Sequence, residues 1–307
     1  MKTLFLGTSD FAATVLRRLA GGAHRPALVV APPDRRRGRG RRLGPPPVAA
    51  VAGELGLDLT QESDVNDAAA RDRLLGAGAE VAVVCAFGQI VKEPLLSAIE
   101  MLNVHPSLLP RWRGAAPIER AIMAGDEVTG VCVMQLTAGL DSGPVALREQ
   151  IPIAADDDYG TLSERLAEAG GALLGTALDR RADGALEFTE QAGDGVTYAE
   201  KIEPPERRVD PSNPAAVEAR RIRALTPHVG AFVTLGDETR LGLRDPRLLE
   251  QGPPPGEFEA IGGSLALGCG SGAIAIGAVQ PPGRRWMDAG DYLRGYGTPA
   301  AAAQPLR

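Results

Sequence analysis

The first half of the chain alternates short apolar runs with amphipathic segments. Apolar runs at Leu4–Leu6, Ala27–Ala31 and Glu80–Ala86 predict buried strands, and the last is continuous, as in a strand covered on both faces. Helices are predicted over Phe11–Ala20, Val48–Gly56 and Ala68–Ala77. Strands that alternate with helices in this way are typical of parallel α/β units. The pattern therefore predicts an α/β domain with a mostly parallel sheet.

The middle of the chain continues this pattern with one abrupt stop. Met101–Val104 predicts a short strand that runs directly into His105, and Pro106 then ends the ladder because proline lacks an amide hydrogen. The further elements predicted here are a helix over Ala115–Ala124, strands over Gly130–Leu136 and Val145–Ile153, and a long helix over Thr161–Arg181. His105 is thus expected at the carboxyl edge of the sheet, where ligand crevices form in open α/β folds.

The pattern changes after the long helix. Residues 189–205 are rich in Gly, Asp, Pro and charge, which predicts a linker between a domain at 1–188 and a second domain at 206–307. The second domain is predicted to contain a helix over Pro214–Leu225 and strands over Ala231–Leu235, Glu257–Ile261 and Ala273–Val279. Short strands separated by Gly and Pro favour a small β-barrel.

Composition narrows the class of protein. With 44% hydrophobic and 23% charged residues the chain falls in the ordinary globular range, so disorder is not indicated. No apolar run approaches the length of a membrane span, and the N-terminal order of a signal peptide is missing, so we expect a cytoplasmic protein. Cys85, Cys132 and Cys269 lack the spacing of a metal or redox motif, which predicts buried thiols and no metal site.

One short segment carries an unusual charge. Residues 34–42 contain six arginines and one acid, a local charge of +5 in a chain whose net charge is −6. Because residues 32–47 have almost no apolar side chains, they predict a mobile surface loop, and its arginines suggest a localised anionic partner. Composition alone supports a solvated loop without a binding role equally well. Because 30 of the 33 basic residues are arginine, arginine clusters also arise by chance.

Asn103 and His105 are the strongest candidates for chemistry. Side chains two residues apart on a strand point to the same face. A carboxamide can donate to an oxyanion and an imidazole can move a proton, and Asp141 in a glycine-bracketed turn can orient that imidazole. These groups fit acyl transfer by direct attack of an amine, because Ser107 lacks the setting of a nucleophile. His105 as a packed histidine and Asp141 as an ordinary turn residue are the open alternatives.

A longer set of residues matches a known family. The matching segments are Asn103-x-His105-x-Ser107-Leu108-Leu109-Pro110-Arg111-Trp112-Arg113-Gly114-Ala115-Ala116-Pro117-Ile118, Ala124-Gly125-Asp126, Thr129-Gly130-Val131, Gly139-Leu140-Asp141-Ser142-Gly143, Gly7-Thr8-Ser9-Asp10-Phe11, Pro33-Asp34 with Gly38-Arg39-Gly40, and Thr197-Tyr198-Ala199-Glu200-Lys201-Ile202. In this order they resemble the methionyl-tRNA formyltransferase family. The last hundred residues match weakly.

The resemblance implies a Rossmann-like N-terminal domain that binds 10-formyl-tetrahydrofolate and an OB-like C-terminal barrel that helps to hold initiator methionyl-tRNA. It places Asn103, His105 and Asp141 at the catalytic positions. Folate-binding residues would be Ser107, Leu108, Leu109 and Pro110, with Phe87, Gly88, Gln89 and Ile90 lining the pterin pocket. The resemblance places Arg39 against the tRNA acceptor stem, and we add Arg41 and Arg42 from the same loop. It also implies formyl-folate as co-substrate and no tightly bound cofactor, and we expect a monomer.

Other functions remain open at this point. A sugar-amine formyltransferase or a formyl-folate hydrolase would use the same three residues on another acceptor, although the arginine loop and Thr197–Ile202 argue against both. A non-catalytic RNA-binding module is a further alternative, and the presence of Asn103, His105 and Asp141 argues against it.

Overall fold

The computed structural model describes residues 1–37 and 42–302, which form two compact units. The first unit comprises residues 1–117, 128–152 and 163–199, and the second comprises residues 118–127, 153–162 and 200–307, as far as these are described. Each unit therefore includes segments that are separated in the sequence. The domain boundaries at 188/189 and 205/206 stay a prediction.

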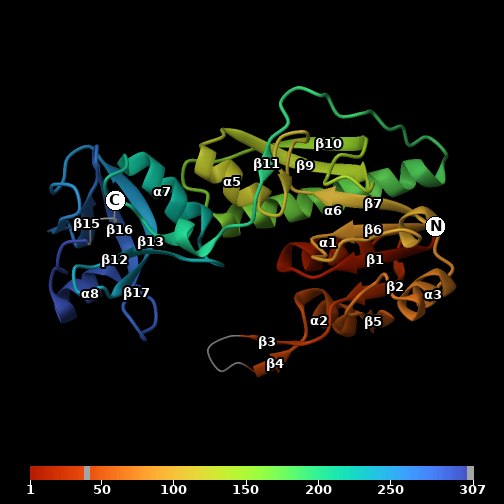
Figure 1. The fold of residues 1–307 in the computed structure, drawn as a ribbon, viewed down its shortest axis with the longest axis horizontal. Helices are drawn as coiled ribbons and strands as arrows, with labels where there is room; N and C mark the ends of the chain where they lie inside the picture. The colour runs from red at the N-terminus through yellow and green to blue at the C-terminus, as the bar shows by residue number, and fades with distance from the viewer. Residues whose placement is uncertain (38–41, 303–307) are drawn as a thin grey trace. The chain divides into compact units, whose positions relative to one another are not determined.

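A seven-stranded sheet forms the centre of the first unit (Figure 1). Its strands are β1 (Thr3–Gly7), β2 (Pro26–Ala31), β5 (Leu59–Gln61), β6 (Val81–Cys85), β7 (Glu100–His105), β9 (Val128–Gln135) and β10 (Val145–Pro152). They lie in the order β10-β9-β7-β6-β1-β2-β5. The five strands from β7 to β5 are parallel, whereas β9 pairs antiparallel with both β7 and β10. The predicted α/β class with a mostly parallel sheet is confirmed.

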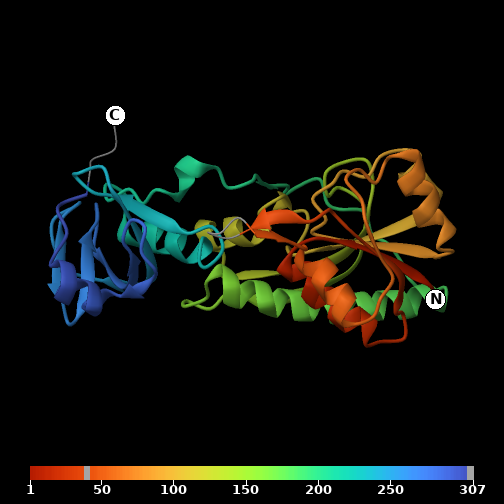
Figure 2. The ribbon, with the colours of Figure 1, turned by 90° about the horizontal axis from the view of Figure 1, so that it is seen from below.

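Helices cover both faces of this sheet (Figure 2). They are α1 (Asp10–Ala20), α2 (Pro47–Glu54), α3 (Ala68–Gly76), the short α4 (Leu95–Ala98), and α6 (Tyr159–Ala182), which also contributes its first turn to the second unit. Helix α1 begins where the Ser9 hydroxyl accepts a hydrogen bond from the Ala12 amide at 3.4 Å. On the other face, Leu74 of α3 packs into a buried cluster with Leu4 and Leu6 of β1.

Side chains along β7 point alternately to the two faces of the sheet, and this alternation determines which of them lie at the candidate active site. Val104 points toward α6, where Gly170 provides space for its side chain, because a Cβ on Gly170 would come within 2.9 Å of Val104. Asn103 and His105 therefore point to the opposite face, on which Met101 joins the cluster of Leu4 and Leu6. The two polar side chains follow this apolar cluster toward the carboxyl end of the strand.

The arginine-rich segment is flanked by two short strands that the sequence pattern did not predict. Strands β3 (Arg35–Arg37) and β4 (Arg42–Gly44) pair antiparallel, with Arg36 opposite Leu43. The pattern predicted a mobile surface loop over residues 32–47 and no strands in it. It missed this ladder because a two-stranded ladder is held by backbone hydrogen bonds and needs no apolar side chains, and the mobility of the loop stays a prediction.

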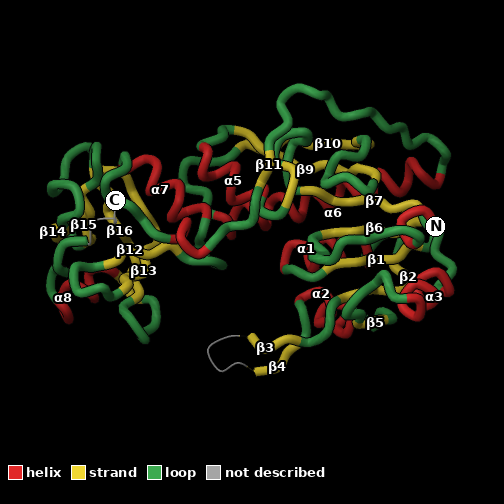
Figure 3. The backbone as a smooth tube through the Cα atoms, in the orientation of Figure 1, coloured by secondary structure: helices red, strands yellow, loops and turns green. Residues whose placement is uncertain are grey.

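The segment after α6 continues within the first unit as a long loop over residues 183–197 (Figure 3). It ends in β11 (Tyr198–Ala199), which pairs in parallel with β8 (Arg113–Gly114). Thr189 also forms an isolated bridge with Val145. The predicted linker at 189–205 therefore makes specific backbone contacts and is more than a tether.

The second unit is built on an antiparallel sheet. Its elements are helix α5 (Pro117–Ala124, from Ile118 on), a 3₁₀ turn at Pro204–Arg207, helices α7 (Ala215–Ala224) and α8 (Ala289–Tyr296), and strands β12 (Ala231–Thr234), β13 (Arg240–Leu249), β14 (Phe258–Ile261), β15 (Ser264–Gly268), β16 (Ala273–Gln280) and β17 (Met287–Asp288). The strand order is β12-β13-β16-β15-β14. Ala302 bridges Leu235, after β12, and its amide donates to the Gly256 oxygen, before β14, at 2.7 Å. These contacts of Ala302 connect the chain next to the two edge strands of the sheet, β12 and β14. The predicted small C-terminal β-domain is confirmed.

The sequence pattern missed β13 and β15. Strand β13 carries Asp245 at φ +54° followed by Pro246, and its register with β16 is the same on both sides of Asp245. Asp and Pro are depleted in strands, so local sequence argues against an element that its neighbours nevertheless hold in place.

The predictions about the cysteine thiols and about membrane spans can be compared directly with the described residues. The thiols of Cys85, Cys132 and Cys269 are free and buried, as predicted, and burial raises the pKa of Cys269 to about 12. Within residues 1–37 and 42–302, none of the helices combines the length and the apolar character that crossing a bilayer requires.

Glu206 provides a test of pH-dependent stability in the second unit. Arg120 of α5 donates to both carboxylate oxygens of Glu206, at 2.5 and 3.1 Å, and these hydrogen bonds hold the pKa of Glu206 below its usual 4.5. A lowered folded-state pKa stabilises the fold above pH 4.5, and the stabilisation is lost as pH falls through the lowered value. Glu206→Gln is therefore expected to lower stability at neutral pH by at most about 1 kcal/mol.

Thermal melts at several pH values check this expectation. The difference between Glu206→Gln and wild type should shrink below pH 4.5, whereas Glu54→Gln, in an exposed pair with Arg17, should change little at any pH. A Glu206→Gln deficit that is independent of pH would contradict the account.

Candidate active site

The structure brings Asn103, His105 and Asp141 together. Asn103 and His105 lie at the carboxyl end of β7, and Asp141 lies in the turn between β9 and β10, 38 positions from Asn103. The carboxamide nitrogen of Asn103 is 3.4 Å from Asp141 Oδ1, and His105 Nδ1 is 3.7 Å from Asp141 Oδ2. Asp141 thus lies within 4 Å of both other side chains, as the catalytic hypothesis requires.

Asp141 is held at an unusual backbone angle. Its φ is +44°, a left-handed conformation that aspartate tolerates better than most residues. Oδ2 accepts a hydrogen bond from the Gly114 amide at 2.8 Å. Gly114 itself has φ +121°, and a Cβ there would come within 2.8 Å of the Ala199 oxygen. Pairing of β8 with β11 therefore places the amide that holds the carboxylate.

His105 has a defined tautomer in this arrangement. Nε2 lies 2.9 Å from the backbone oxygen of Trp112, and because a carbonyl can only accept, Nε2 carries the hydrogen. Nδ1 is then the nitrogen that faces Asp141 and that gains or loses a proton. The predicted proximity of the imidazole to the carboxylate is observed, and the Trp112 carbonyl is a partner that the sequence did not reveal.

Burial makes these groups effective. Asn103 is 8% exposed and His105 4% exposed, so their polar atoms act away from bulk water, where electrostatic interactions are stronger. A neutral donor and a proton carrier, each within 4 Å of the same carboxylate, can together stabilise an oxyanion and transfer a proton.

The predicted folate segment is only partly accessible. Ser107 is fully buried and its hydroxyl donates to the Arg111 oxygen at 2.7 Å, while Leu109 packs in a buried cluster with Cys132. Leu108 and Pro110 are half-buried. The side chains of Ser107 and Leu109 therefore support the loop from within, and the folate role of Ser107, Leu108, Leu109 and Pro110 stays a prediction.

The segment predicted to line the pterin pocket is also divided. Phe87 is buried, and its oxygen accepts from the Thr8 hydroxyl at 2.5 Å. Gln89 donates to the Glu62 oxygen and accepts from the Val65 amide, so its amide supports neighbouring backbone. Gly88 and Ile90 are exposed. Of the four residues predicted to line the pterin pocket, Gly88 and Ile90 are therefore the exposed ones.

The arginines predicted to bind tRNA cannot be placed. Arg39 and Arg41 lie outside the described residues, and for Arg42 the structure describes the backbone at the start of β4 but not the side chain. Their role stays a prediction.

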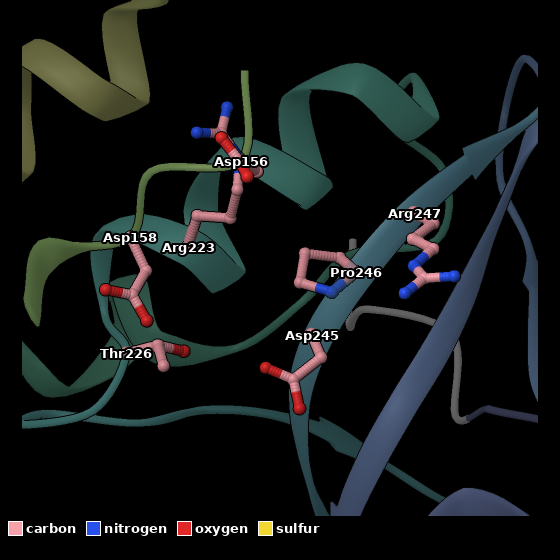
Figure 4. A pocket seen from close by; sticks show the side chains of 7 residues that line it. All are labelled: Asp156, Asp158, Arg223, Thr226, Asp245, Pro246 and Arg247. Atoms are coloured by element: carbon pink, nitrogen blue, oxygen red, sulfur yellow. The ribbon is translucent and has the colours of Figure 1, made fainter. Parts of the chain in front are cut away.

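A cavity of about 300 Å³ lies in the second unit (Figure 4). It is lined by Asp156, Asp158, Arg223, Thr226, Asp245, Pro246 and Arg247. None of these is a predicted site residue. In the described ranges, no group of three or more His, Cys, Asp or Glu side chains is arranged to hold a metal ion.

Comparison with known proteins identifies the family. Residues 1–178 match the formyl transferase family model, and residues 201–297 match the model of the formyl transferase C-terminal domain. The chain is 44% identical to the methionyl-tRNA formyltransferase of Ruegeria pomeroyi, over 97% of this chain and 98% of the relative. The chain belongs to the methionyl-tRNA formyltransferase family. The enzyme of Cereibacter sphaeroides is similar at 43% identity over 97% of both chains. The resemblance read from the sequence is confirmed.

Solved structures with the same fold include proteins that are not named methionyl-tRNA formyltransferase. HypX from Aquifex aeolicus in complex with tetrahydrofolic acid superposes with a TM-score of 0.68 at 17% identity, over all of this chain and half of HypX. An N-formyltransferase from Helicobacter canadensis in complex with folinic acid and dTDP-3-aminofucose gives 0.66 at 16% identity, over 90% of this chain and 98% of that protein. At such identities the likeness establishes the fold and leaves the acceptor to other observations.

Proposed function

We propose that this protein transfers the formyl group of 10-formyl-tetrahydrofolate to the α-amino group of methionyl initiator tRNA, as a cytoplasmic monomer that serves translation initiation. The observation that carries the proposal is the identity of more than 40% to methionyl-tRNA formyltransferases over nearly the whole chain, with Asn103, His105 and Asp141 gathered at one point. The acceptor follows from this similarity and not from the fold, because the N-formyltransferase from Helicobacter canadensis, which was solved with dTDP-3-aminofucose, has the same fold.

The reaction begins with attack of the α-amino nitrogen on the formyl carbon. An α-amino group titrates near about 8, so a useful neutral fraction exists at cellular pH. As the new C–N bond forms, the formyl oxygen becomes negative. The Asn103 amide is the buried donor available to this oxyanion, and a proton on His105 Nδ1 is the second.

The proton balance is closed by His105 and Asp141. With Nδ1 protonated, the attacking nitrogen loses its proton to the Asp141 carboxylate. The bond from the formyl carbon to folate N10 breaks, N10 receives the proton of His105 Nδ1, and Asp141 returns a proton to Nδ1. The products are formyl-methionyl-tRNA and tetrahydrofolate. The Trp112 carbonyl keeps the Nε2 hydrogen in place, so the proton moves at Nδ1.

Formyl transfer measured on several acceptors tests the proposal. Purified protein with 10-formyl-tetrahydrofolate is expected to formylate methionyl initiator tRNA and to leave a nucleotide amino-sugar unmodified. Transfer to the amino-sugar alone, release of formate without an acceptor, or tRNA binding with no turnover would each contradict it.

The arginine loop provides a separate prediction about the tRNA. Arg39→Ala is expected to lower kcat/KM on methionyl-tRNA by about tenfold, the size of one charge-assisted hydrogen bond, and to reduce the salt dependence of tRNA affinity. Turnover on a minimal amine acceptor should remain near wild type. Arg180→Ala, an exposed arginine of α6, is the control. Equal loss on both acceptors would exclude a tRNA role for Arg39.

A further inference from the structure

Gln191 lies in the loop after α6 and contacts the turn that carries Asp141. Its amide nitrogen donates to the backbone oxygen of Asp141 at 2.7 Å and to the backbone oxygen of Gly143 at 2.8 Å. Both hydrogens of the amide are therefore used on the backbone of one turn. Gln191 is 50 positions from Asp141, so only the folded loop over residues 183–197 brings them together.

Arg113 fixes the other half of the same amide. Its Nε and one terminal nitrogen donate to Gln191 Oε1, at 3.1 and 2.7 Å. Because a guanidinium only donates and a carbonyl only accepts, the amide of Gln191 can take only one orientation. The positive charge of Arg113 also polarises the amide and strengthens its donation to the two carbonyl oxygens.

The two ends of this network meet at Asp141. Arg113 is followed by Gly114, whose amide holds Asp141 Oδ2, and Gln191 holds the Asp141 backbone. The strained φ of +44° at Asp141 needs such restraint, since a left-handed residue persists only where its surroundings determine it.

We propose that Gln191 and Arg113 together position the Asp141 carboxylate toward His105 for formyl transfer. The inference rests on the proposed function. Gln191 is a positioning residue, because it touches Asp141 through the backbone and none of the predicted reacting groups directly. Without it two carbonyl oxygens lose their donors and the turn is released, so the carboxylate no longer stays within 4 Å of Nδ1.

Two substitutions separate positioning from simple attachment. Gln191→Met removes all four hydrogen bonds, whereas Gln191→Glu keeps an acceptor for Arg113 and removes both donors to the turn. We expect both variants to lower kcat by about 10- to 100-fold, as a misplacement of about 1 Å does, with little change in the KM for formyl-folate. Gln150→Met, an exposed residue of β10, should match wild type in kcat and melting temperature.

The outcomes decide between the alternatives. Wild-type kcat in Gln191→Met would overturn the inference, and so would full activity in Gln191→Glu, since the contact with Arg113 alone would then suffice. Arg113→Met added to Gln191→Met should cost little more than the single change, because both act through one network. Independent effects that multiply would contradict this.

A crystal structure of Gln191→Met tests the inference without the reaction. We expect Asp141 Oδ2 to leave the Gly114 amide and to move away from His105, and retention of the 2.8 and 3.7 Å separations would overturn the inference. If wild-type protein transfers no formyl group to tRNA, the proposed function fails, and this structural measurement still judges the position of Asp141.

Discussion

Asn103→Ala is expected to lower kcat for formyl transfer about 100-fold or more, as the loss of one oxyanion donor does elsewhere. Asn103 is 8% exposed and its carboxamide is directed at Asp141, so water cannot easily replace it as a donor. Because the oxyanion exists only in the transition state, KM for both substrates should change little. Single-turnover formylation of methionyl-tRNA measures this effect.

Thr129→Val is the matched control for this substitution. Thr129 lies on the neighbouring strand β9 and is 3% exposed, and its hydroxyl has no hydrogen-bond partner among the described residues. Its removal changes a buried polar atom of the same sheet without touching the site. Near-normal turnover in Asn103→Ala, or an equal loss in Thr129→Val, would refute the assignment of Asn103.

Asp141→Asn is expected to lower kcat by about 100- to 10,000-fold, the range of a positioned acid–base group. The side chain keeps its shape and loses its charge. Oδ2 accepts from the Gly114 amide at 2.8 Å and faces His105 Nδ1, while Oδ1 faces the Asn103 amide nitrogen at 3.4 Å. In the variant, either the oxygen takes the Oδ2 position and the new NH2 group meets the Asn103 NH2 group, or the NH2 group takes the Oδ2 position and the Gly114 hydrogen bond is lost. The negative charge that stabilises a proton on Nδ1 is lost in both cases.

The rate of formyl transfer as a function of pH separates this effect from misfolding. Wild type should show a pH dependence of kcat that Asp141→Asn alters, while the melting temperatures remain close. Asp72→Asn, an exposed carboxylate of α3, should leave the rate and its pH dependence unchanged. An Asp141→Asn variant within about tenfold of wild type would exclude Asp141 from proton transfer.

Much of the fold follows from local pattern. The buried run at β6 and the amphipathic segment at α1 were predicted to within a residue or two, because apolar periodicity reports burial directly. Strand β13 was missed because Asp245 and Pro246 contradict the strand pattern, and neighbours in the sheet outweigh local preference. The ladder of β3 and β4 was missed because backbone pairing leaves no apolar signature.

The sequence by itself determined the family, the α/β class and the three polar side chains predicted for the chemistry. These depend on the order and type of residues, and the spacing of Asn103 and His105 already placed both on one face of a strand. The tertiary structure decided what those groups touch: the Trp112 carbonyl that sets the imidazole tautomer, the Gly114 amide on Asp141, and Gln191 behind its backbone. These partners are backbone atoms or come from distant loops, and only the folded chain brings such atoms within hydrogen-bond distance.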